Sequence, residues 1–190
     1  MEKIDVYNEF SDNYLLMEMR NHELRGKLAQ NLSAIKDPRE KIIALRNHFA
    51  KDFDYDYQFI FSGNDYEWRN FKINGKEYES QSVQYEHILP SSVYLTKLGR
   101  CAIYSEEVDY LINKNGIACN PVIAKKSPCL NIYKGQFENM KHQYNQAKIE
   151  VGKKKKLINI DICALIFERD AKARDLDIDY SKLHELNTPL

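Results

Sequence analysis

The chain has 190 residues, of which 43% are hydrophobic and 12% aromatic, so it can bury a substantial core as one domain. Its 28 basic and 28 acidic side chains cancel, which argues against a chain-wide basic surface for nucleic acid. No stretch approaches the roughly 18 consecutive apolar residues of a membrane span, and residues 1–5 do not resemble a secretory signal. We therefore expect a cytoplasmic protein that binds neither nucleic acid nor membrane, with export by another route left open.

The N-terminal part of the chain carries helical signals. Apolar side chains recur at helical spacing over residues 14–35, which predicts a first amphipathic helix. The pair Asp37-Pro38 is typical of an N-cap followed by the first position of a helix. A second helix is therefore expected to begin here, with Ile42, Leu45 and Phe49 on its apolar face.

The middle of the chain contains one strong hairpin signal. Residues 71–73 and 76–78 flank Asn74-Gly75, a pair that two-residue hairpin turns favour. We expect an insertion over about residues 58–80 that is irregular at first and ends in this hairpin. The insertion is either a surface addition or a flap beside a cleft.

Two helices are predicted after this insertion. A short one is expected within residues 82–97, before the break at Gly99. A longer amphipathic helix is expected over residues 102–114, and Asn115-Gly116 is typical of the cap that ends it.

The remaining sequence predicts an antiparallel sheet. Strands are expected over residues 117–124, 142–151 and 155–161, and a turn at Gly152-Lys153 joins the last two. The tail from residue 166 onward carries only weak helical signals. Helices and an antiparallel sheet together indicate an α+β fold.

Three residues combine into a candidate nucleophile, base and orienting group. Cys101 directly precedes the longer predicted helix, where the positive end of the helix dipole stabilises a thiolate. His142 opens one predicted strand and Asp161 closes the next, and the midpoint between them falls on the predicted turn. A carboxylate beside a histidine fixes the tautomer and stabilises the imidazolium that an activated thiol needs. Taken singly, each residue is equally compatible with a structural role in a core, at a surface or in a turn.

These segments resemble the transglutaminase-like superfamily of cysteine enzymes. Residues 92–117, SVYLTKLGRCAIYSEEVDYLINKNGI, are similar to its nucleophile segment, with a glycine turn before the cysteine and a Gly-Ile pair after the helix. Residues 142–161, HQYNQAKIEVGKKKKLINID, are similar to its histidine strand, its Gly-Lys turn and the strand that ends in aspartate. The helix over residues 37–49 and the following Tyr55 resemble the family's leading helix and its tyrosine.

The resemblance implies a papain-like α+β core in which the cysteine helix packs on an antiparallel sheet that carries His142 and Asp161. It implies that Cys101 attacks a carboxamide or peptide carbonyl, that His142 shuttles the proton and that Asp161 orients His142. The backbone N–H of Cys101 is then expected to bind the oxyanion together with one further donor.

Three more side chains are candidates for oxyanion or substrate contacts. Asn145 matches an asparagine that often follows the family's histidine by three residues, and Gln81 and Gln84 lie upstream of the nucleophile. The chain departs from the family pattern at Cys163, where a small hydroxyl residue is usual, and over residues 157–159, where aromatic residues are usual. These departures affect the expected substrate fit and leave the three catalytic candidates in place.

The other cysteines are expected to be free thiols. Cys119, Cys129 and Cys163 form no CxxC pair with one another or with Cys101, so zinc ligation is not predicted. An even count of cysteines leaves two disulfides as the alternative. No metal and no cofactor are expected.

We expect a single domain over residues 1–190. It would contain a helical extension over residues 1–36, a transglutaminase-like core over residues 37–165 and a tail over residues 166–190. The predicted function is cysteine-dependent processing of amides in a protein or peptide substrate, as a protease, amidase, deamidase or transglutaminase. A non-catalytic protein-binding module on the same fold, or a secreted or injected effector with the same chemistry, is the alternative. The oligomeric state is left open.

Overall fold

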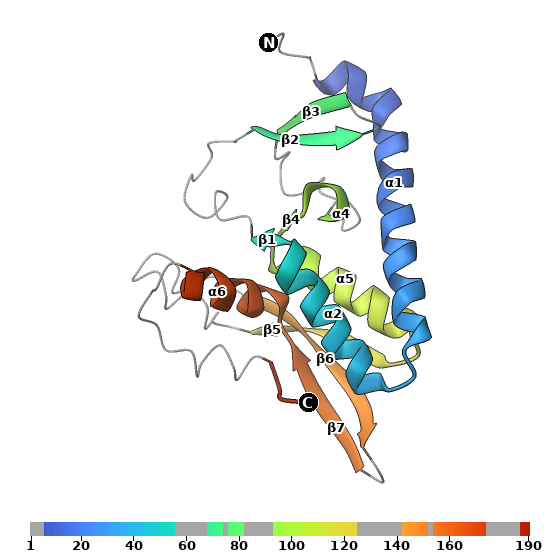
Figure 1. Cartoon of the computed structure of the whole chain (residues 1–190), viewed down its shortest axis with the longest axis vertical. Helices are drawn as coiled ribbons and strands as arrows, with labels where there is room; N and C mark the ends of the chain where they lie inside the picture. The colour runs from blue at the N-terminus through green and yellow to red at the C-terminus, as the bar shows by residue number, and fades with distance from the viewer. Residues whose placement is uncertain are drawn as a thin grey trace.

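The computed structural model describes residues 6–55, 68–73, 76–81, 93–124, 142–151, 154–173 and 187–190. The fold is α+β, as predicted, with helices packed against a three-stranded antiparallel sheet in the order β5-β6-β7 (Figure 1). The helices are α1 (Val6–Ala34), α2 (Pro38–Asp52), α4 (Val93–Thr96), α5 (Cys101–Lys114) and α6 (Ile162–Ala173). The sheet strands are β5 (Ala118–Ala124), β6 (His142–Val151) and β7 (Lys154–Ile160). The other strands are β1 (Asp54–Tyr55), β2 (Trp68–Ile73), β3 (Lys76–Gln81) and β4 (Leu98–Gly99).

The start of α2 confirms the predicted cap. Asp37 has extended backbone angles, and its side chain accepts a hydrogen bond of 2.8 Å from the backbone N–H of Arg39. Pro38 occupies the first helical position, where its missing N–H removes no helical hydrogen bond. Ile42, Leu45 and Phe49 are completely buried, so the predicted apolar face is the one that the helix packs inward.

The predicted hairpin in the middle of the chain is confirmed. Strands β2 and β3 pair antiparallel from Trp68 opposite Gln81 to Ile73 opposite Lys76. The connecting residues, Asn74 and Gly75, lie outside the described residues, as do residues 56–67 of the predicted insertion.

The sheet matches the three predicted strands to within a residue at each end. In β5 and β6, Ala118 pairs with Lys148 and Ala124 with His142. Strands β6 and β7 pair from Val151 opposite Lys154 to Asn145 opposite Ile160.

The register of β6 and β7 differs in one respect from the predicted pairing. Their pairing is centred between Gly152 and Lys153, later than a direct pairing of His142 with Asp161 requires. Continued past its last pair, the register would place Asp161 opposite Tyr144. His142 and Asp161 are therefore diagonal neighbours, which long side chains can still bridge.

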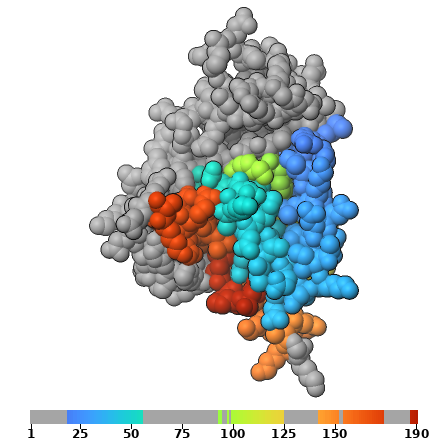
Figure 2. All heavy atoms as spheres, viewed as in Figure 1, coloured from blue at the N-terminus to red at the C-terminus, as the bar shows by residue number. Residues whose placement is uncertain are grey.

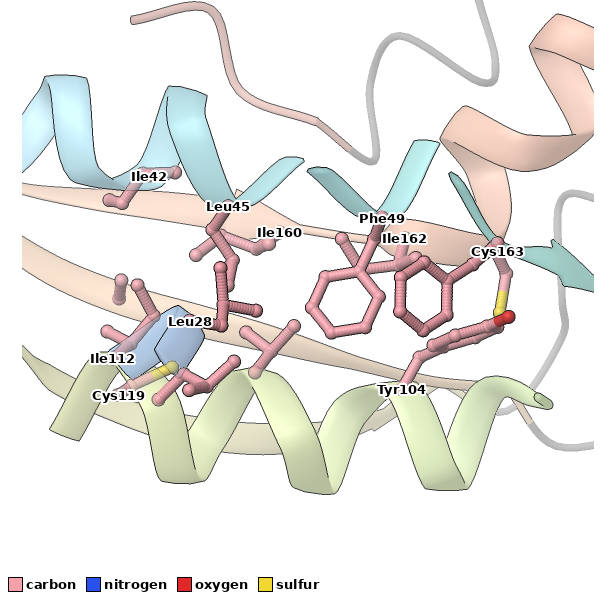
Figure 3. Packing of buried hydrophobic residues seen from close by; sticks show 14 of the residues in the cluster. Leu28, Ile42, Leu45, Phe49, Tyr104, Ile112, Cys119, Ile160, Ile162 and Cys163 are labelled. Carbon is pink, nitrogen blue, oxygen red and sulfur yellow. The ribbon is translucent and has the colours of Figure 1, made fainter. Parts of the chain in front are cut away.

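The core lies between α2, α5 and the sheet (Figure 3). Phe49 from α2 meets Phe53 at a ring-centroid distance of 4.7 Å and Tyr104 from α5 at 5.7 Å. Figure 3 shows the Phe49 and Tyr104 rings beside Ile162 and Cys163 at the start of α6, so one hydrophobic cluster joins α2, α5 and α6. Edge-to-face contacts of this kind add to the free energy gained by burying the rings.

Helix α6 was not predicted from the sequence pattern, because the residues from 166 onward carry only weak helical signals. Ile162, Cys163, Ile166 and Phe167 are all buried and follow helical spacing. Arg169 fixes the helix by donating hydrogen bonds of 2.8 Å to carbonyl groups at the end of α2. The chain from residue 162 to 173 is therefore part of the packed core and not an appendage.

A buried polar cluster ties the long helix α1 to the rest of the molecule. Glu107 on α5 is completely buried and pairs with the Arg25 Nε of α1 at 3.0 Å. The Tyr94 hydroxyl of α4 donates to the same carboxylate oxygen at 2.9 Å. Burial raises the pKa of Glu107, although Arg25 and Tyr94 oppose that effect.

No helix in the described part of the chain is long and apolar enough to cross a membrane.

The segment before α5 is held by a close contact that only glycine allows. β1 and β4 pair in parallel, with Tyr55 opposite Gly99, and the Tyr104 hydroxyl donates to the carbonyl of Asp54. The Tyr104 ring then covers Gly99, where an added Cβ would lie 2.8 Å from the ring carbon that bears the hydroxyl. Gly99 thus lets the chain pass under the ring just before Cys101.

Gly99→Ala is expected to lower the free energy of unfolding by about 1–3 kcal/mol, because the new methyl group overpacks against the buried Tyr104 ring. Urea denaturation checks this value. Gly26→Ala is the matched control, since Gly26 lies exposed within α1 with nothing within 4 Å of an added Cβ. The control should raise stability by up to about 1 kcal/mol through helix propensity. Equal effects of the two substitutions would contradict the packing described for Gly99.

Candidate active site

Cys101 is the first residue of α5 and is partly exposed. The preceding Arg100 has extended backbone angles, and its side chain makes no capping hydrogen bond to the helix. The N–H groups of the first helical turn have no partner within the helix and carry the positive end of its dipole. The sulfur of Cys101 therefore lies where a negative charge is stabilised.

His142 lies at the first position of β6, and its side chain is only 4% exposed. The Nε2 atom of its ring is 2.5 Å from the Oδ2 atom of Asp161. This contact fixes the ring orientation and leaves Nδ1 as the nitrogen available for another partner.

Asp161 occupies the junction between β7 and α6. One carboxylate oxygen, Oδ2, bonds to His142, and the other, Oδ1, accepts a hydrogen bond of 3.0 Å from the backbone N–H of Ala164. The second bond is that of an N-cap, so Asp161 also begins α6. Asp161 thus has both of the roles expected for it: it forms the turn into α6, and it orients His142.

The Cys101 thiol interacts with the His142 imidazole strongly enough to shift its pKa, and His142 is in turn bound to Asp161, so the three predicted side chains lie in one neighbourhood. Burial alone raises the pKa of Cys101, but the hydrogen bond and charge of His142 outweigh it, and the pKa is lowered. The backbone of Gln143 also hydrogen-bonds to the sulfur and contributes to the lowering. The site therefore favours the thiolate.

The charge state of His142 follows from the same contacts. Burial lowers the pKa of the ring, but the charge and hydrogen bond of Asp161, with those of Cys101, raise it to about 10. The imidazolium form of His142 is therefore favoured at neutral pH. A buried charge of either sign would be costly alone, so each member of this ion pair requires the other.

A second set of contacts holds the start of β6 against α5. Ser105 lies four residues after Cys101 on the same face of the helix. Its hydroxyl accepts a hydrogen bond of 3.1 Å from the side chain of Gln143 and donates one of 3.5 Å to the carbonyl of Tyr144. These bonds connect the helix that carries the thiol to the strand that carries the imidazole.

Of the three further candidates, the structure describes the side-chain surroundings of Asn145. Asn145 is only 1% exposed, and its amide lies beside the Cys119 thiol, so it is not placed to contact a substrate. Gln81 ends β3 opposite Trp68. Gln84 lies outside the described residues, so the second oxyanion donor stays unassigned.

The other described cysteines, Cys119 and Cys163, are buried. Cys119 and Cys163 are 3% and 1% exposed, and Cys163 packs in the core at the start of α6. Burial raises the pKa of Cys119 to about 12. Cys129 lies outside the described residues.

Several contributors to the site carried little signal in the sequence. Ser105 could have been found from its helical spacing to Cys101, and Gln143 from its place beside His142. Asn187, which hydrogen-bonds to the backbone of Asp161, is 26 residues away along the chain and has no local pattern. Only the folded chain brings it to the site.

Within the described ranges, no cluster of three or more His, Cys, Asp or Glu side chains could hold a metal ion. Comparison with protein-family models, with curated proteins and with solved structures finds no match to this chain.

Alkylation by limiting iodoacetamide should modify Cys101 first. Cys119 is buried, and at pH 7 only about one molecule in 10⁵ would carry it as a thiolate, given its pKa of about 12. As the pH is lowered from the ordinary range of a thiol pKa, the alkylation rate at Cys101 should stay high. It should fall only once the pH passes below the lowered pKa of Cys101 and the sulfur becomes protonated. Peptide mapping by mass spectrometry at a series of pH values measures both effects.

His142→Ala is the informative variant in this experiment. Without the imidazolium, the burial that raises the pKa of the thiol is opposed only by the Gln143 backbone and the helix N-terminus, so labelling of Cys101 at neutral pH should become slower. An unchanged pH profile in this variant would show that His142 does not activate the thiol.

Proposed function

We propose that this chain is a cysteine-dependent amide-processing enzyme with a papain-like core of the transglutaminase-like type. The observation that carries the proposal is the buried His142–Asp161 pair, which interacts with the Cys101 thiol at the N-terminus of a helix. A nucleophile, a base and a group that orients the base are the components that covalent acyl transfer needs.

Acylation begins from the ion pair. The Cys101 thiolate attacks the carbonyl carbon of a carboxamide or peptide, and the C–S bond forms as the carbonyl electrons move to oxygen. Collapse of this intermediate breaks the C–N bond, while the His142 imidazolium gives its proton to the departing nitrogen. The products are a thioester on Cys101 and a free amine or ammonia.

The second half of the reaction decides the activity class. His142, now neutral, takes a proton from the incoming nucleophile as it attacks the thioester carbon. Water as the nucleophile gives hydrolysis or deamidation, and a substrate amine gives cross-linking. The C–S bond breaks in either case and regenerates the ion pair.

The transition state develops negative charge on the carbonyl oxygen. The backbone N–H of Cys101 lies at the start of α5 and is the first donor that we assign to that oxygen. The same end of the helix dipole that favours the thiolate also favours the oxyanion. Asp161 keeps the imidazole aligned throughout, because its two oxygens are held by His142 and by the start of α6.

The test is incubation with a library of peptides that contain glutamine, asparagine and internal amide bonds, together with a primary amine. Mass spectrometry distinguishes cleavage, deamidation and amine addition. We expect one of these products from the wild type and none from Cys101→Ala, whose stability should stay within about 1 kcal/mol of wild type. Cys119→Ala is the control, because it removes a thiol outside the site and should keep turnover.

Asp161→Asn should lower turnover at least about a hundredfold, because an amide can orient the ring but cannot balance the imidazolium charge. Circular dichroism checks that the variant is folded. No product from the wild type, or equal turnover by wild type and Cys101→Ala, would contradict the proposal. Equal ligand binding by the two proteins without turnover would favour the protein-binding module.

A further inference from the structure

Among the described strands, β7 lies at the edge of the sheet, because the sheet order is β5-β6-β7 and β7 pairs with β6 on one side. An edge strand presents backbone N–H and C=O groups that have no partner in the sheet. At the end of β7, such groups belong to Asn159, which lies near the candidate active site, and to Asp161, which is part of it. Their partners come from a segment far along the chain, residues 187–190.

The Asn187 side chain pairs with the backbone of Asp161 as a peptide group would. Its Oδ1 atom accepts a hydrogen bond of 3.0 Å from the Asp161 N–H, and its Nδ2 atom donates one of 2.9 Å to the Asp161 carbonyl. An amide side chain has one acceptor and one donor group in this geometry, so it pairs with the N–H and the C=O of Asp161 at once. The Asp161 carbonyl also accepts a hydrogen bond of 3.4 Å from the Leu165 N–H, and an alanine at position 187 would supply neither of the Asn187 bonds.

The neighbouring contacts hold this segment in place. The hydroxyl oxygen of Thr188 accepts a hydrogen bond of 2.9 Å from the backbone N–H of Asn159, two residues before Asp161. Arg46 of α2 donates to the carbonyl of Thr188 at 3.1 Å and to the carbonyl of Asn159 at 2.5 Å. Figure 2 shows the segment, in red, at the surface beside α2, in cyan. The segment is thus fixed to both the strand and the helix.

The backbone of Asp161 decides where its carboxylate points. The residue lies where an extended strand changes into a helix, and its two oxygens serve different partners, His142 and the start of α6. A small rotation of this backbone would lengthen the contact to His142. Side chains of an active site must be held to within about half an ångström to work together.

We propose that Asn187 is a positioning residue, which holds the Asp161 backbone so that the carboxylate stays aligned with His142. The proposal rests on the proposed function for its catalytic meaning, but its effect on the thiolate can be measured without a substrate. Loss of Asn187 weakens the contact between Asp161 and His142. The imidazolium is then less favoured, and the pKa of Cys101 moves toward its ordinary range.

The experiment compares Asn187→Ala with Thr188→Val in the full chain, using the pH profile of Cys101 alkylation by iodoacetamide. Asn187→Ala removes both bonds to Asp161 and should slow alkylation about tenfold at a pH below the midpoint of the wild-type profile. It should also move the midpoint of the profile upward by about one pH unit. Thr188→Val keeps both bonds to Asp161 and loses only the bond to Asn159, so its profile should match the wild type.

Urea denaturation of both variants separates alignment from stability. A purely structural role would destabilise the two proteins and leave the alkylation profile of the folded protein unchanged, which would overturn the proposal. If Asn187→Ala does not fold, Asn187→Asp keeps the acceptor for the Asp161 N–H and loses the donor to its carbonyl. An unchanged profile in that variant, or an equal shift in Thr188→Val, would also overturn it.

The readout is independent of any amide substrate. An upward shift in Asn187→Ala with no turnover by the wild type would support the positioning role and contradict the proposed function. Turnover by the wild type with an unshifted profile in Asn187→Ala would support the proposed function and contradict the positioning role.

Discussion

The hydrogen bond between His142 and Asp161 joins two side chains that are 4% and 1% exposed. A carboxylate buried to that extent is costly unless a positive partner and further hydrogen bonds compensate it. His142 supplies the positive partner, and the first turn of α6 supplies a backbone N–H. The pKa of His142 is raised to about 10 as a result, and the imidazolium in turn lowers the pKa of Cys101. The reactivity of an accessible thiol therefore depends on a contact that solvent hardly touches.

This contact has to be built by elements that are distant along the chain. The aromatic cluster around Phe49 and Tyr104 fixes α5 against α2, and α5 also packs along β6 through the bonds of Ser105. Gly99 lets the chain pass closely under Tyr104 before it reaches the thiol. Helix α6 begins directly at Asp161, so the carboxylate is held by the element that it caps. A change in any of these packing contacts is transmitted to the geometry of the ion pair.

The local pattern of the sequence was enough to predict the elements that carry the candidate site and the approach of His142 to Asp161. Helical and strand periodicity located α2, α5, β6 and β7, and the position of Cys101 before a helix indicated a thiolate. The exact register of β6 with β7 could not be predicted, because it depends on a turn geometry that the pair Gly152-Lys153 does not specify. Asn187 could not be predicted either, since no periodicity links it to a strand 26 residues earlier. Asn145 fits the family pattern but points into the core, where burial removes it from any substrate.

We propose that Cys101 and His142 form a thiolate and imidazolium pair at neutral pH, since each lies where the other's charge shifts its pKa toward the charged form. The most direct measurement is the ultraviolet absorbance of the thiolate, followed across pH in the wild type, in Cys101→Ala and in His142→Ala. We expect one thiolate absorbance that persists below the ordinary range of cysteine, is absent from Cys101→Ala and moves to higher pH in His142→Ala. A wild-type absorbance that appears only in the ordinary range, or one that His142→Ala leaves unchanged, would contradict the ion pair.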